Sequence, residues 1–175
     1  FGLPIAPQGA AEAEGRTLDL AVGRHLLDRH MAAADLPLVE TAGGLGSPLA
    51  PGTLVLDLAR AMGLPVLLVA PHTLGSVGQS LVCARLLEHE GIPCAGILLS
   101  RTDPGPEGPE AGTHAPLLKE HGWGVPLVGI LPHLGTAPPA RPPEQYAAWA
   151  MEQASTVEQH LDLDLLAPPN KSGPQ

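Results

Sequence analysis

The chain has 175 residues, of which 44% are hydrophobic, and a formal net charge of −9. This length suits a globular domain with a sizeable core, and the acidic balance argues against nucleic acid or anionic membrane as a partner. No apolar run approaches the roughly 20 residues that a membrane span needs. Two cysteines without a CxxC pair, and no visible signal peptide, lead us to expect a cytoplasmic protein.

The first part of the chain predicts three helices and one strand. We expect a short alanine-rich helix within residues 1–15, a helix at 17–34 with apolar residues at helical spacing, and another at 53–62. Between them, the apolar run at 36–40 predicts a strand buried in a parallel sheet.

Three further strands and three further helices follow in alternation. The strands are expected at residues 65–70, 93–100 and 126–131, and the helices at 76–90, 114–121 and 144–166. This alternation predicts an α/β fold, a parallel sheet with flanking helices. We interpret residues 1–166 as a single domain and 167–175 as a disordered tail. Because four strands are few for such a sheet, we expect a central strand to lie outside this chain.

The segment LVETAGG at residues 38–44 holds the most informative candidate. An apolar run ends in Glu40, and Thr41, Ala42 and a glycine pair follow. Ligands bind at the carboxyl ends of strands in open α/β sheets, and glycines there let backbone N–H groups approach an anion. An acid in that place typically binds the Mg²⁺ of a nucleotide. A lone acid would more simply be a surface residue, but the glycine turn favours the metal ligand.

Lysine is nearly absent, which limits how a nucleotide can be held. Lys119 and Lys171 are the only lysines, and no GxxxxGK[ST] motif occurs. The chain therefore has no phosphate-binding loop of its own.

Other candidates lie after the later strands. The segment PHTLGSVG at 71–78 leads into a helix whose first N–H groups can bind an anion, although an ordinary turn explains it equally simply. We interpret His72 as a loop histidine with its hydrogen bonds satisfied, in preference to an acid/base group. Residues 132–134 and the pair Ser100-Arg101 can wall a nucleotide base, or can be plain turns.

Five segments, in this order, resemble those of the dethiobiotin synthetase family. They are PIAPQGAAEAEG at 4–15, LVETAGG at 38–44, LPVLLVAPHTLGSVGQSL at 64–81, EGIPCAGILLS at 90–100 and VPLVGILPHLG at 125–135. The resemblance covers about residues 1–135. It implies a P-loop NTPase-like fold, incomplete at the N-terminus, and a homodimer. It also implies the synthesis of dethiobiotin from 7,8-diaminononanoate and CO₂ with ATP and Mg²⁺.

The resemblance also implies roles for particular residues. Glu40 would bind Mg²⁺. The residues along the nucleotide phosphates would be Thr41, Ala42 and Gly43, and those near the substrate would be Gly43, Gly44, Leu74, Gly75, Ser76 and Val77. Those beside the adenine would be Ser100, Arg101, Pro132, His133 and Leu134.

The sequence departs from the family pattern in several places. The P-loop, the catalytic lysine and a metal-binding aspartate would all precede residue 1, so we expect the chain alone to be inactive. Ser100 stands where the family has an asparagine, and serine offers only a hydroxyl. Arg101 stands where an aspartate is common, and Gly78 where asparagine is frequent. Two alternatives are an ATP-dependent amide synthetase of the cobyrinic acid type and a non-catalytic dimerising remnant.

Overall fold

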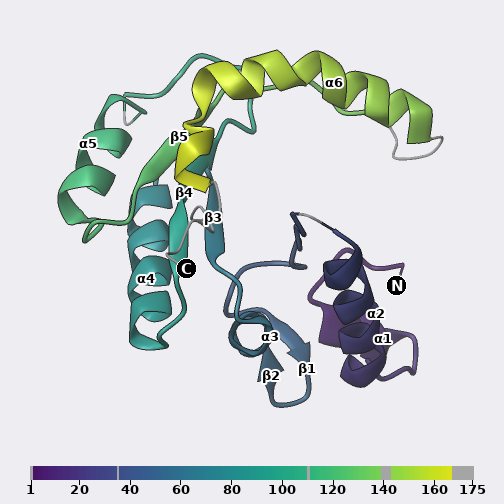
Figure 1. Ribbon diagram of the computed structural model, residues 1–175. Helices are drawn as coiled ribbons and strands as arrows, with labels where there is room; N and C mark the ends of the chain where they lie inside the picture. The colour runs from purple at the N-terminus through teal and green to yellow at the C-terminus, as the bar shows by residue number, and fades with distance from the viewer. Residues whose placement is uncertain (1, 35, 110, 139–142, 167–175) are drawn as a thin grey trace, which may run out of the picture. The chain divides into compact units, whose positions relative to one another are not determined.

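The computed structural model describes residues 2–34, 36–109, 111–138 and 143–166 (Figure 1). The chain divides into two compact units, residues 1–64 and 65–175. The single domain that the sequence predicts over 1–166 stays a prediction, and the expected tail at 167–175 lies outside the described residues. No helix among the described residues is long and apolar enough to cross a membrane.

The first unit consists of three helices and a small antiparallel hairpin. Its elements are α1 (Pro7–Ala13), α2 (Leu20–Ala33), β1 (Pro48–Ala50), β2 (Thr53–Leu54) and α3 (Val55–Met62). The three predicted helices are thus confirmed, with Asp19 capping α2 through a hydrogen bond from the Ala21 N–H at 2.9 Å. The hairpin was not predicted.

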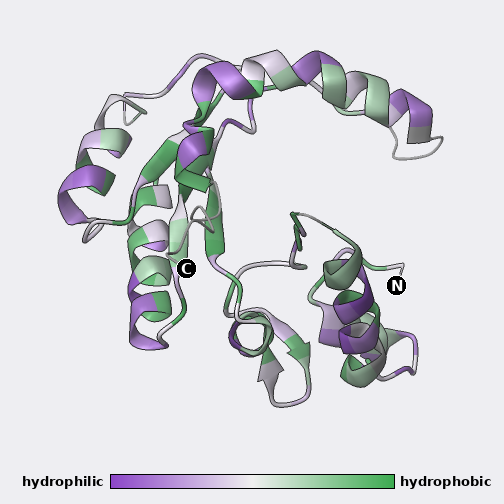
Figure 2. Cartoon of the chain, in the orientation of Figure 1, coloured by the Kyte–Doolittle hydropathy of each residue, from purple (hydrophilic) through white to green (hydrophobic). Residues whose placement is uncertain are grey.

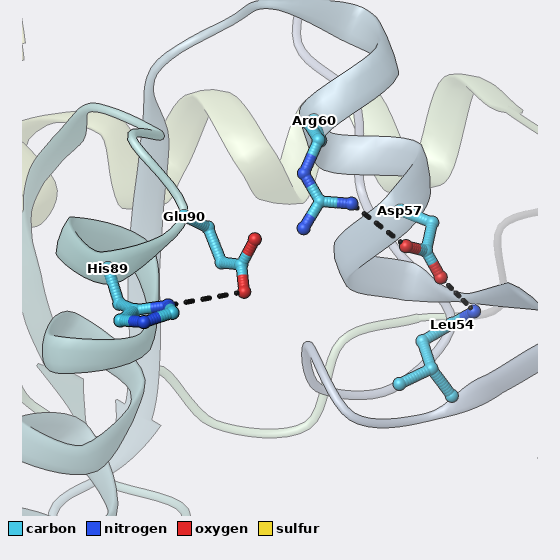
Figure 3. A network of polar contacts seen from close by, with 5 residues as sticks. All are labelled: Leu54, Asp57, Arg60, His89 and Glu90. Carbon is cyan, nitrogen blue, oxygen red and sulfur yellow. Dashed lines mark hydrogen bonds and ion pairs between the residues drawn. The ribbon is translucent and has the colours of Figure 1, made fainter.

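The local sequence explains where helix α3 begins and where it ends. The Asp57 carboxylate accepts the Leu54 N–H at 2.8 Å, and its other oxygen lies 3.1 Å from Arg60 Nη1 (Figure 3). This carboxylate satisfies a backbone donor that the helix cannot pair internally. Gly63 ends the helix with a φ of 66°, a left-handed conformation that glycine adopts without strain.

The second unit is an α/β fold with a three-stranded parallel sheet. The strands are β3 (Val66–Pro71), β4 (Cys94–Ser100) and β5 (Leu127–Leu131), in the order β3-β4-β5. The helices are α4 (Ser76–His89), α5 (Ala111–His121) and α6 (Pro143–His160), followed by the 3₁₀ turn η1 (Leu163–Leu166). Each strand and helix lies close to its predicted place, although the helix predicted at 144–166 ends at His160.

The central strand β4 forms the core of this unit. Ile97 and Leu99 are fully buried and pack against Leu118 of α5. Figure 2 shows that the three strands are hydrophobic along much of their length. Strand β4 has four buried residues, whereas β3 has none and leaves Val69 65% exposed.

The prediction of a strand at residues 36–40 is wrong. This segment has no regular structure, and Leu36 and Leu38 are 61% and 88% exposed. An apolar run becomes a strand only when a neighbouring strand accepts its backbone hydrogen bonds, and no described strand pairs with it. The parallel sheet therefore has three strands within the described chain instead of the four predicted.

Candidate functional site

A cavity of about 290 Å³ lies in the second unit, where its three parallel strands end. His72 directly follows β3, Arg101 follows β4 and Pro132 follows β5, and all three line the cavity. The other lining residues are Glu107, Ala111, Gly112, Ile130 and His160. This is the edge of an α/β sheet at which ligands bind, because loops and helix starts converge there.

Arg101 is held in the cavity wall by the loop that follows it. Its Nη1 lies 3.5 Å from the Glu107 Oε1, and its Nη2 donates to the carbonyl oxygens of Asp103, at 3.5 Å, and of Gly105. Its backbone N–H donates to the Leu131 carbonyl at 2.9 Å. The guanidinium is therefore a fixed planar cation, which can stack on an aromatic ring.

His72 does not fit its interpretation as a histidine with satisfied hydrogen bonds. Its backbone N–H donates to the Ser100 carbonyl at 2.8 Å, and its ring meets the ring of His114 edge-on, with 4.8 Å between centroids. Neither ring nitrogen has a hydrogen-bond partner among the described residues, and both are shut off from solvent. Buried polar side chains are normally paired, so this ring is an exception.

The predicted base-site residues are only partly brought together. Arg101 and Pro132 line the same cavity. Ser100, His133 and Leu134 are not among the described residues that line it; His133 instead accepts the Gly135 N–H on its Nδ1 at 3.2 Å. Sequence reasoning missed Glu107 and His160, which reach the cavity from a loop and from the end of α6.

The start of α4 is the predicted anion site. Gly75 precedes the helix with a φ of 94°, and the Ser76 hydroxyl turns back to donate to the Pro71 carbonyl. The Ser76 N–H donates to the Thr73 carbonyl at 3.2 Å, so it is already used. The N–H groups of Val77 and Gly78 donate to no acceptor among the described residues, as expected of a first helical turn. Leu74, just before the helix, is 83% exposed.

Glu40 and the residues after it belong to the first unit, and the cavity belongs to the second. Glu40 is exposed, and no hydrogen bond or ion pair engages its carboxylate within the described residues. Thr41 Oγ1 donates to the Gly43 carbonyl at 2.9 Å, and Gly43 has a φ of 93°. A side chain at Gly43 would also meet Ser47, with its Cβ 3.0 Å from the Ser47 Cβ, so glycine is required there.

No protein-only metal cluster is present in the described ranges. No three His, Cys, Asp or Glu side chains among them are arranged to hold a metal. A magnesium ion carried by a nucleotide needs only one or two protein carboxylates, because phosphates and water supply the other ligands. The exposed Glu40 carboxylate fits that kind of site.

Residues 1–141 match the family model described as AAA domain. The chain is also similar to proteins named ATP-dependent dethiobiotin synthetase BioD. It is 46% identical over 108 residues to the one from Anaeromyxobacter dehalogenans, covering 59% of this chain and 47% of that protein. It is 35% identical over 134 residues to the Synechocystis protein, covering 77% and 56%. It is 34% identical over 154 residues to the Phenylobacterium zucineum protein, covering 86% of this chain and 60% of that protein. The chain thus spans about half the length of the curated relatives that it matches.

Proposed function

The chain belongs to the AAA domain family, and from this membership and its relatives we propose that it is part of an ATP-dependent dethiobiotin synthetase. The reaction would join 7,8-diaminononanoate and CO₂ into the ureido ring of dethiobiotin, in the cytoplasm. The relatives named above are synthetases of this kind, which favours the proposal over an amide synthetase or a non-catalytic remnant.

The base of the ATP would occupy the cavity at the ends of β3, β4 and β5. This assignment rests on one observation: Arg101 and Pro132, which the resemblance places beside the adenine, line the same cavity. Pro132 offers an apolar surface to the ring, and the fixed guanidinium of Arg101 can stack on its face. Ser100, His133 and Leu134 would complete the surroundings of the base.

The phosphates and the metal would lie against the segment that begins at Glu40. Glu40 would supply one carboxylate to Mg²⁺, and the backbone of Thr41, Ala42 and Gly43 would run along the phosphates. The bound metal would neutralise charge on the phosphates. The left-handed Gly43 lets the backbone approach an anion closely because no Cβ intervenes.

The carboxylate of 7,8-diaminononanoate would lie at the start of α4. The N–H groups of Val77 and Gly78, which have no acceptor among the described residues, and the positive end of the helix dipole favour an anion there. Leu74, Gly75 and Ser76 would border the rest of the substrate. Two copies of the protein would form a homodimer.

A change at the cavity tests the nucleotide assignment. Arg101→Ala in the protein at its natural length should raise the KM for ATP by about tenfold, because a fixed stacking cation is removed, and should change kcat less. Arg24→Ala is the matched control, since Arg24 is half-exposed on α2 and, among the described residues, forms an ion pair with Asp28 at 3.6 Å. An unchanged KM in Arg101→Ala would contradict the placement of the base.

A further inference from the structure

His72 lies in the wall of the cavity with two ring nitrogens that the described protein leaves unused. We propose that His72 makes a direct hydrogen bond to the nucleotide base and is a specificity-determining residue of this site. The inference rests on the proposed function, which assigns the cavity to the base.

The position of His72 is set from two sides. Its backbone N–H is bonded to the Ser100 carbonyl at the end of the neighbouring strand, at 2.8 Å. Its ring lies edge-on to the ring of His114, a residue of α5 that is 3% exposed. The backbone of His72 is therefore anchored at the cavity, and a buried neighbour packs against its ring.

The unused nitrogens give the ring a reason to bind an occupant. A buried polar group without a partner costs free energy, which a ligand recovers if it supplies the missing donor or acceptor. The Cβ–Cγ torsion of histidine has a broad energy profile, so the ring can turn to present a nitrogen to the cavity at little cost.

The charged residues of the cavity wall do not call for an anion. Arg101 and Glu107 both line the cavity, and Arg101 Nη1 lies 3.5 Å from Glu107 Oε1, so the two charges offset each other and leave little net attraction for a phosphate or a carboxylate. A neutral imidazole presents one donor and one acceptor, and the edge of adenine likewise offers both kinds of group. Ser100, at the position of the family asparagine, is not among the described lining residues, whereas His72 is, so His72 offers a polar contact from the cavity wall itself.

Adenosine titrations of the 175-residue chain test this inference, because adenosine carries the base without phosphates. The dissociation constant and the ring nitrogen resonances of His72 are measured by NMR. We expect these resonances to move on binding. His72→Phe keeps a ring against His114 but removes both nitrogens, and should weaken binding about three- to tenfold. His72→Asn restores a donor and an acceptor and should bind more tightly than His72→Phe.

His89→Phe is the matched control, since His89 is the last residue of α4 and is not among the residues that line the cavity. Its Nδ1 lies 3.5 Å from the Glu90 Oε1 (Figure 3). Its adenosine affinity should equal that of the unaltered chain. Equal affinity in His72→Phe, or unmoved His72 resonances in the adenosine complex, would overturn the role of His72 and leave the cavity as the base site. No adenosine binding by the unaltered chain would overturn both assignments. If His72→Phe does not fold, the resonances and His72→Asn decide the question.

Discussion

Replacing Gly129 by alanine should destabilise the second unit and disturb the cavity wall. Gly129 lies on β5, where the chain after α6 crosses it: the Asp162 N–H donates to the Val128 carbonyl at 2.8 Å. An added Cβ would overlap the backbone oxygen of His160 and lie 2.8 Å from Leu161 Cδ2. The crossing segment must move, which combines an overpacking cost with one lost hydrogen bond. The expected loss in unfolding free energy is about 2–4 kcal/mol.

Urea unfolding followed by tryptophan fluorescence measures this loss in the second unit alone. The two tryptophans, Trp123 and Trp149, both belong to that unit. Gly129→Ala should lower the urea midpoint by about 1 M or more with little change in slope. Gly78→Ala is the control, because an added Cβ there meets nothing within 4 Å and alanine favours the helix. An unaltered midpoint in Gly129→Ala would refute the reasoning.

Three further predictions address the core, the thiols and the metal ligand. Leu99→Ala should cost about 2–5 kcal/mol in urea unfolding, whereas Val82→Ala, at a residue 70% exposed, should cost under about 0.5 kcal/mol. Burial raises the pKa of the Cys83 and Cys94 thiols, so both should react with a disulfide reagent more slowly than free cysteine at pH 8. Because the pKa values of these thiols are higher in the folded than in the unfolded protein, the thiols should not change the unfolding free energy well below about pH 8.5 and should lower it as the pH rises further. An unfolding free energy that increases above this pH would contradict the prediction. In the protein at its natural length, Glu40→Gln should lower the rate of Mg²⁺-dependent ATP turnover by at least about tenfold while the melting temperature stays unchanged.

Local signals in the sequence were enough to predict most elements of the fold. The helix ends at Gly63 and Gly91 could be predicted because helices commonly end at a glycine in the left-handed conformation. Both glycines adopt it, with φ values of 66° and 67°. The runs that became β3, β4 and β5 were also clear, since strands of a parallel sheet are apolar on both faces.

Pairing between distant segments could not be predicted in the same way. Residues 36–40 have the composition of a buried strand, but their structure depends on a neighbour that the run itself does not encode. The hairpin of β1 and β2 was missed because its strands are very short, although Gly52, with a φ of 70°, marks its turn.

The candidate site shows the same division between local and distant signals. Arg101 and Pro132 could be predicted because each directly follows a strand, and strand ends meet at one edge of a parallel sheet. His160 could not, because it reaches the cavity only through the direction that α6 takes across the unit. The unsatisfied ring of His72 is a property of its packing and leaves no mark in the sequence.

Formation of dethiobiotin by the protein at its natural length tests the central claim most directly. The purified protein is incubated with 7,8-diaminononanoate, ¹³C-bicarbonate, ATP and Mg²⁺, and the product is identified by mass spectrometry. The proposal predicts dethiobiotin that carries the label in its ureido carbon, formed only when ATP is present. Folded protein that forms no labelled dethiobiotin, or that consumes ATP to make an amide instead, would contradict it.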